Sequence, residues 1–121
     1  MERYQLTFPQ LSLWSVEQFY KGTSINVITG FIKINETVNF HLFNDAIEIL
    51  IKNTDIFGMH LSYENGELTQ VLTTPKNKRI RIIDVSSKED LENLQNTIAK
   101  TPFNIFEDDL FDFTIFRLPD N

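Results

Sequence analysis

The sequence predicts an α/β (α+β) domain in which a mixed sheet carries helices packed on one face. Two observations lead to this class. Three segments with apolar residues at helical spacing each follow a capping residue, and they alternate with short apolar segments of strand length. In addition, Asn65-Gly66 separates two such segments, which is a strong local signal for a β-hairpin. We therefore expect the order helix, strand, helix, hairpin, strand, helix, strand.

The first helix is predicted to begin after Thr7. Thr7 and Gln10 have the spacing of a capping box, in which each side chain bonds to the backbone of the other residue. Pro9 falls in the first turn, where a missing N–H costs nothing. The apolar residues that follow at helical spacing are Leu13, Val16 and Tyr20.

The middle of the chain predicts a strand, a helix and the hairpin. Residues 25–34 have apolar side chains at both alternating sets of positions, which favours an inner strand. Asn39 is predicted to cap a helix whose apolar residues recur at intervals of three and four, and Asn53 to end it. The hairpin strands are expected at residues 57–63 and 67–73.

The last third predicts a short strand at residues 80–85, a helix and a final strand. Ser86 and Glu89 have the spacing of a second capping box. Pro102 is predicted to end the helix, because the residue before a proline avoids helical geometry. The last strand is expected from Phe111 to Leu118, where apolar residues alternate.

Composition limits the function classes. The 121 residues carry a net charge of −6, and no basic cluster exceeds residues 76–81, so nucleic-acid and anionic-membrane binding are not expected. Without cysteine the chain has no disulfide, no thiol catalysis and no cysteine-based zinc site. Eleven phenylalanines predict an aromatic core or interface. No apolar segment has the length of a membrane span or signal core, and we expect a cytoplasmic protein.

The N-terminal features follow a recognisable order: a Leu-Thr-x-x-Gln-x-x-x-Trp helix, a Gly-Thr turn, then Asn followed by apolar residues. The residues concerned are Leu6, Thr7, Gln10, Trp14, Gly22, Thr23, Asn26, Val27 and Ile28. This order resembles the opening of a nonribosomal peptide synthetase condensation domain. The family usually has Pro directly after the Thr, where this chain has Phe8.

The resemblance continues along residues 1–121. Pro102-Phe103-Asn104-Ile105 is similar to the family's Pro-Phe-Asp-Leu. The family's Arg-His-Glu-x-Leu-Arg is poorly matched, because Asn53, Thr54 and Phe57 replace its His, Glu and final Arg. The resemblance implies the N-terminal lobe of a chloramphenicol acetyltransferase-like fold. It also implies that residues 1–121 are the N-terminal part of a condensation domain, ending before its His-His-x-x-x-Asp-Gly motif.

Condensation domains join an upstream peptidyl or acyl thioester to a downstream aminoacyl thioester, both carried on the phosphopantetheine of carrier proteins. The second His of the motif accepts a proton from the amine or stabilises the tetrahedral intermediate. The resemblance therefore implies that this segment is inactive alone and binds no cofactor directly. Its implied partners are peptidyl or acyl carrier proteins and the C-terminal lobe of the same domain. Gln10, Trp14 and Asn26 are its motif residues expected to line the cleft, although a cap explains Gln10 and a core position Trp14.

No residue of the chain is predicted to be catalytic or to bind a metal or cofactor. His60 loosely echoes the catalytic motif with Asn65-Gly66, but the spacing is one residue too long and the hairpin already explains Asn-Gly. His41 is expected in the first turn of a helix, in solvent. Glu107-Asp108-Asp109 and Asp112 lack the longer glycine-containing pattern of calcium loops, so solvated carboxylates are expected. The basic residues 76–81 would suit an acidic carrier protein, yet a solvated loop is the expectation.

Two other functions fit the same residues. One is a related acyltransferase or epimerase of the same fold, and the other is a free-standing, non-catalytic module that binds a carrier protein. Sequence beyond Asn121 discriminates them: a following His-His-x-x-x-Asp-Gly excludes the non-catalytic module, and a stop codon excludes the condensation domain. Because the family has a further strand after Phe111 to Leu118, we also expect self-association through that strand.

Overall fold

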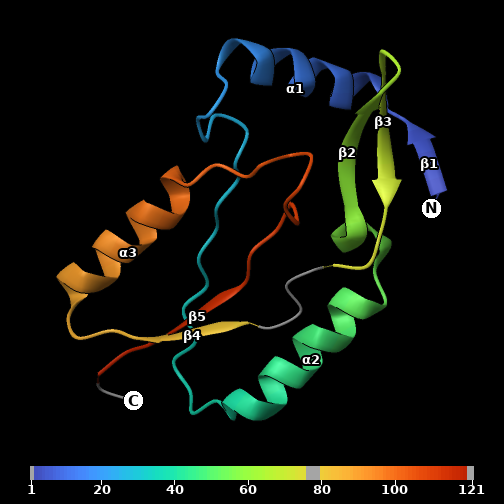
Figure 1. Ribbon diagram of the computed structural model, residues 1–121. Helices are drawn as coiled ribbons and strands as arrows, with labels where there is room; N and C mark the ends of the chain where they lie inside the picture. The colour runs from blue at the N-terminus through green and yellow to red at the C-terminus, as the bar shows by residue number, and fades with distance from the viewer. Residues whose placement is uncertain (1, 76–79, 120–121) are drawn as a thin grey trace.

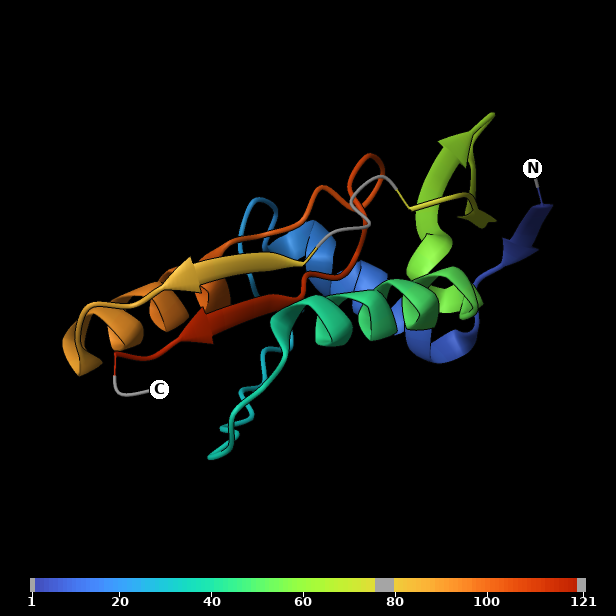
Figure 2. The ribbon, with the colours of Figure 1, turned by 90° about the horizontal axis from the view of Figure 1, so that it is seen from below.

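The computed structural model describes residues 2–75 and 80–119. The elements in chain order are β1 (Glu2–Gln5), α1 (Phe8–Phe19), α2 (Phe40–Lys52), the 3-10 helix η1 (Asp55–Gly58), β2 (Met59–Glu64), β3 (Glu67–Leu72), β4 (Arg81–Asp84), α3 (Lys88–Lys100) and β5 (Thr114–Arg117). This order confirms the α/β class. Figure 1 shows α1 lying across one end of the molecule beside the hairpin of β2 and β3. The pair β4 and β5 runs between α2 and α3 (Figures 1 and 2).

The strands include both directions, as predicted for a mixed arrangement, but they are divided between two sheets. One sheet is antiparallel in the order β1-β3-β2, and the other is the parallel pair β4-β5. The hairpin prediction is confirmed, with Glu64 opposite Glu67 and Met59 opposite Leu72. Asn65 and Gly66 have φ values of 53° and 77°, the left-handed conformation that a two-residue hairpin turn requires.

Local chemistry explains where the first two helices begin. The Thr7 amide donates to Gln10 Oε1 at 2.8 Å, and the Gln10 amide donates to Thr7 Oγ1 at 3.4 Å, so the predicted capping box is present. Asn39 caps α2, since its Oδ1 accepts from the Leu42 amide at 3.1 Å. Asn53 ends α2 as predicted.

The N-cap of α3 lies one residue after the predicted Ser86. The N-cap is Ser87, whose Oγ accepts from the Asp90 amide at 3.1 Å. Asp90, rather than Glu89, reaches back and accepts from the Ser86 amide at 3.1 Å. The helix therefore starts at Lys88. It ends at Lys100, as the proline after Thr101 predicted.

The predicted strand at residues 25–34 is wrong. No helix or strand covers this segment, and residues 28–38 make no hydrogen bond with the described part of the chain. Apolar residues at alternating positions favour a strand, but a strand also needs a neighbour to pair with its backbone. The final strand is shorter than predicted, Thr114–Arg117. Strand β1, which pairs with β3 from Glu2 opposite Leu72 onwards, had no strong sequence signal.

The core is small. The buried apolar side chains of the described residues are Ile51, Val71, Ile80 and Val85. At the far end of β4-β5, Arg117 binds the Asp84 carboxylate through Nε at 2.6 Å and a terminal nitrogen at 2.9 Å, which raises the pKa of Arg117. Its guanidinium also lies 5.3 Å from the ring centre of Phe40 at the start of α2. In the part of the chain that the structure describes, no helix has the length and apolar character to span a bilayer.

Candidate functional site

The described residues surround a hollow of about 710 Å³. Its walls come from α1, from residues 23–31, from the C-terminal end of α3 and from the segment that leads into β5. Most of the lining side chains are apolar. They include Leu13, Trp14, Val27, Phe103, Phe111 and Phe116.

Gln10 holds α1 against the antiparallel sheet. Its amide nitrogen donates to Gln70 Oε1 at 2.9 Å, and Gln70 Nε2 donates back to Gln10 Oε1 at 3.1 Å. Gln70 Nε2 also donates to the Gln5 carbonyl at 3.0 Å. The Gln10 side chain thus caps α1, bonds to Gln70 of β3 and lines the hollow. The cap explains Gln10 as predicted, and the link to Gln70 is an additional contact that the sequence pattern did not reveal.

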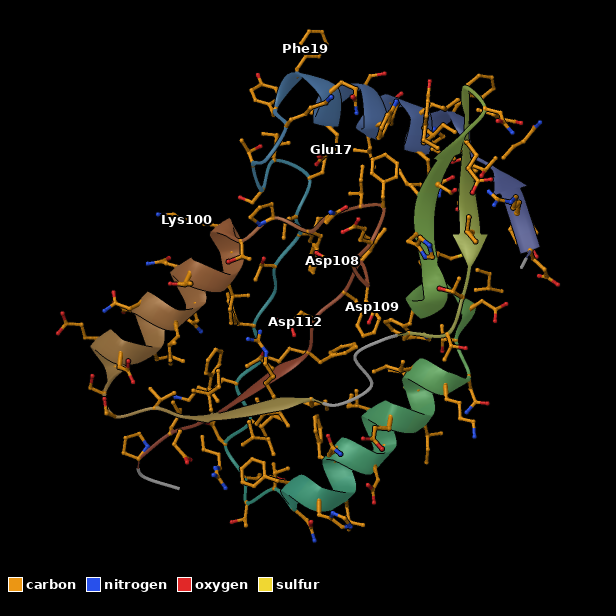
Figure 3. The ribbon with its side chains drawn as sticks, viewed as in Figure 1. Glu17, Phe19, Lys100, Asp108, Asp109 and Asp112 are labelled. Atoms are coloured by element: carbon orange, nitrogen blue, oxygen red, sulfur yellow. The ribbon has the colours of Figure 1, made fainter. Side chains whose placement is uncertain are left out.

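Asn26 fastens the segment after α1 to the helix itself. Its Nδ2 donates to the Leu13 carbonyl at 3.0 Å and to Glu17 Oε1 at 3.3 Å. Figure 3 shows Glu17 on the inner side of α1 and Phe19 on its outer side. The Asn26 contacts therefore set the path of the chain along the inner side of α1, where Glu17 and Asn26 both line the hollow.

Trp14 has features of both a core residue and a cleft residue. It is half-buried, lines the hollow, and packs edge-on against Phe106 with ring centroids 5.7 Å apart and an interplanar angle of 75°. Gln10, Trp14 and Asn26 thus all lie on the wall of one hollow. That they contact a substrate stays a prediction.

Phe57, which replaces the final Arg of the family's Arg-His-Glu-x-Leu-Arg motif, belongs to an aromatic cluster. The Phe57 ring lies 4.8 Å from that of Phe111 and 5.7 Å from that of Phe113. Asn53 acts as the C-cap of α2, with its Nδ2 donating to the Ile49 carbonyl at 2.8 Å. These residues serve packing and helix termination in this chain. The high phenylalanine content predicted such a cluster, but not its members.

The histidines lie apart from the hollow. His60 is in β2, where its Nδ1 is 3.3 Å from Thr73 Oγ1, and its ring does not line the hollow. His41 lies in the first turn of α2, as predicted, with Nε2 3.5 Å from an Asp45 carboxylate oxygen.

The acidic residues bond to neighbouring groups. An Asp108 oxygen accepts from the Asn104 amide at 2.8 Å, and Asn104 Nδ2 donates to Glu107 at 3.2 Å. Asp112 accepts from Arg81. Figure 3 shows Asp108, Asp109 and Asp112 along one loop, and no group of metal-ligand side chains was found within residues 2–75 and 80–119. Of the basic segment predicted at residues 76–81, residues 76–79 lie outside the described residues, and Arg81 is the first residue of β4.

A family model for the condensation domain matches residues 1–121. Among curated relatives, the chain is 28% identical over 125 residues to surfactin synthase subunit 1 of Bacillus subtilis (strain 168). It is 28% identical over 108 residues to a dimodular nonribosomal peptide synthase of the same organism. These alignments cover 98% and 89% of this chain but 4% of each relative, so the chain spans a small fraction of their length.

Solved condensation domains share the fold. The first condensation domain of the calcium-dependent antibiotic synthetase, in complex with substrate analogue 2a, has a TM-score of 0.82 at 16% identity. The starter condensation domain of rhizomide synthetase RzmA has a TM-score of 0.71 at 19% identity. The matches cover 99% and 97% of this chain and 30% and 29% of those chains.

Proposed function

This chain belongs to the condensation-domain family, and we propose that it forms the N-terminal part of a nonribosomal peptide synthetase condensation domain. In the complete domain it would supply one wall of the cleft in which two thioesters are joined by a peptide bond. Its substrates would arrive on the phosphopantetheine of peptidyl or acyl carrier proteins, and the chain itself would bind no cofactor. We propose a cytoplasmic location, with which the lack of cysteine is compatible.

One observation carries the proposal. Residues that match the family pattern near the N-terminus and residues that match it about 80 positions later line the same hollow. Gln10 and Trp14 come from α1, Asn26 from the segment after it, and Phe103 from the segment after α3. An apolar hollow with a few polar groups is what a binding cleft for an acyl or peptidyl chain requires.

The positions of the histidines support inactivity of the segment alone. Aminolysis of a thioester needs a group that can take a proton near neutral pH, for which an imidazole is well suited. The chain has two histidines, and neither lines the hollow. The His-His-x-x-x-Asp-Gly pattern does not occur in the sequence. We therefore propose that the imidazole comes from other residues of the complete domain.

Trp14 offers a direct test, because it is the single tryptophan of the chain. We expect a leucyl-pantetheine thioester to shift the indole N–H resonance and the fluorescence of Trp14 saturably, and leucine methyl ester, which lacks the arm, to have a weaker effect. Asn26→Ala is the matched variant: it removes a polar group from the wall and should weaken the response without abolishing the fold. A Trp14 signal that does not respond to the thioester would contradict the cleft assignment.

Inactivity is tested separately by mixing the chain with peptidyl- and aminoacyl-loaded carrier proteins and analysing the products by mass spectrometry. We expect the peptide yield to equal that of the loaded carrier proteins mixed without the chain. Peptide formed in excess of that background would contradict the proposal that the segment lacks its catalytic group.

A non-catalytic carrier-binding module is the second candidate, favoured by the packing role of Phe57 where the family has a polar residue. Both candidates predict an inactive chain. They differ in the gene: a reading frame that continues into His-His-x-x-x-Asp-Gly supports the condensation domain, and a stop codon after Asn121 supports the module.

A further inference from the structure

Asn104 organises the turn between α3 and β5. Its backbone amide donates to an Asp108 carboxylate oxygen at 2.8 Å, and its carbonyl oxygen accepts from the amides of Glu107 and Asp108 at 3.2 and 2.8 Å. Its side-chain Oδ1 accepts from the Phe106 amide at 3.1 Å, and its Nδ2 donates to a Glu107 carboxylate oxygen at 3.2 Å. Both the backbone and the side chain of Asn104 thus hold residues 104–108 in one conformation.

The two residues after Asn104 connect this turn to other elements. The Ile105 carbonyl accepts from the Leu61 amide of β2 at 2.9 Å, and Ile105 lines the hollow. The Phe106 ring packs edge-on against Trp14 of α1, with ring centroids 5.7 Å apart. In Figure 1 the segment after α3 runs toward α1 and the hairpin before it turns back to β5. The turn therefore sets where this segment meets α1 and β2.

The contact with Phe106 limits the orientation of Trp14. Trp14 is only half-buried, so its surroundings leave the indole room for more than one side-chain rotamer. An edge-on aromatic contact stabilises the rotamer that makes it. The position of Phe106 depends in turn on its own amide, which is bound by the Asn104 side chain. A chain of contacts therefore runs from Asn104 through Phe106 to the wall of the hollow.

We propose that Asn104 is a positioning residue, which fixes Phe106 and thereby the orientation of the Trp14 indole at the wall where a thioester substrate binds. Asn104 is not among the residues that line the hollow, so it acts through its neighbours. The effect of Asn104 on substrate binding rests on the proposed function. Its effect on Trp14 rests on the contacts alone.

An amide group suits position 104 because it can accept and donate at the same time. A carboxylate would still accept from the Phe106 amide, but it could not donate to Glu107. It would also lie close to the carboxylates of Glu107 and Asp108, which bond to Asn104 in the present turn. Asp at this position is therefore expected to preserve part of the function of Asn, and an apolar residue none of it.

The first experiment records the indole N–H resonance and the fluorescence of Trp14 without ligand. Phe106→Ala gives the reference for a lost ring contact. We expect Asn104→Ala to move both signals toward those of Phe106→Ala, and Asn104→Asp to lie between Asn104→Ala and the unsubstituted chain. Asn96→Ala is the matched control, because Asn96 is exposed on α3, and this change should leave both signals where they are.

The second experiment titrates the leucyl-pantetheine thioester into the same variants and follows Trp14. We expect the apparent Kd to rise about three- to tenfold in Asn104→Ala, as for the loss of one or two hydrogen bonds, and to stay unchanged in Asn96→Ala. Urea unfolding shows whether each variant is folded. If Asn104→Ala is not folded, Asn104→Leu, which keeps the size of the side chain without its acceptor, takes its place.

Two results overturn the inference. One is a folded variant without the acceptor whose Trp14 signals match those of the unsubstituted chain. The other is a shifted Trp14 signal with an unchanged Kd, because Asn104 would then serve the turn and not the hollow. A thioester that leaves Trp14 of the unsubstituted chain unaffected contradicts the proposed function instead, and the ligand-free spectra then still decide whether Asn104 positions Trp14.

Discussion

Two glycines, Gly58 and Gly66, occupy positions where another residue would be strained, for different reasons. Gly66 has φ of 77°, and a Cβ added there would meet nothing within 4 Å. Gly58 has ordinary φ but lies against β3, where an added Cβ would collide with the Thr73 carbonyl oxygen. The same residue type therefore serves conformation at one position and close packing at the other.

Gly66→Ala is expected to destabilise the chain by about 1–2 kcal/mol, because an L residue in the left-handed region brings its Cβ close to the backbone. The measurement is the free energy of unfolding in urea at low protein concentration. Gly30→Ala is the control: it also adds a methyl group in open space, but at a residue without positive φ. That change should be neutral or slightly stabilising. Equal losses in both variants would contradict the role of the turn.

Sequence reasoning identified Gly66 and missed Gly58 for a physical reason. Asn-Gly has a turn preference that depends only on local conformation. The role of Gly58 depends on Thr73, fifteen positions later, whose amide donates to the Gly58 carbonyl at 2.8 Å. Contacts of this type follow from the path of the chain. The Gln10–Gln70 amide pair at the candidate site was missed for the same reason.

At the scale of elements, the same division appears between local and non-local causes. The starts of α1 and α2 were predicted because Thr7 and Asn39 bond to their own helices. The start of α3 was displaced by one residue, because Ser86-Ser87 and Glu89-Asp90 offer two equivalent caps. The strand at residues 25–34 failed because pairing, not pattern, defines a strand. Gln10, Trp14 and Asn26 nonetheless line one hollow, because Gln10 and Trp14 lie in the correctly predicted α1 and the Asn26 side chain bonds to that helix.

The aromatic cluster joins η1 to the segment before β5, and Phe57 lies at its centre. Phe57→Ala should cost about 3 kcal/mol, because it removes a half-buried ring and both aromatic contacts. Urea unfolding monitored by circular dichroism measures the loss. Phe19→Ala removes the same side chain from a position that is 85% exposed, and should change stability by less than about 0.5 kcal/mol. Similar losses for the two variants would show that the cluster contributes little.

At the scale of the whole molecule, the balance between buried and exposed apolar groups is unusual. Ile51, Val71, Ile80 and Val85 are buried, whereas Phe8, Ile28 and Ile32 are almost fully exposed. Most proteins of this length bury a larger share of their apolar surface. This balance agrees with the proposal that the segment is completed by further residues of a condensation domain, of which the solved examples are about three times longer than their match to this chain.

The exposed apolar surface predicts how the isolated chain unfolds. The slope of unfolding free energy against urea scales with the surface exposed on unfolding, so we expect about 1 kcal/mol/M, at the low end for small proteins. We also expect the folded chain, diluted until monomeric, to bind a hydrophobic dye and to increase its fluorescence. Ile28→Asp together with Ile32→Asp should reduce the dye signal without changing the slope, because both side chains are already in solvent. A steep, cooperative transition without dye binding would mean that the chain buries these groups in solution, and that it is complete as a folded unit without further residues.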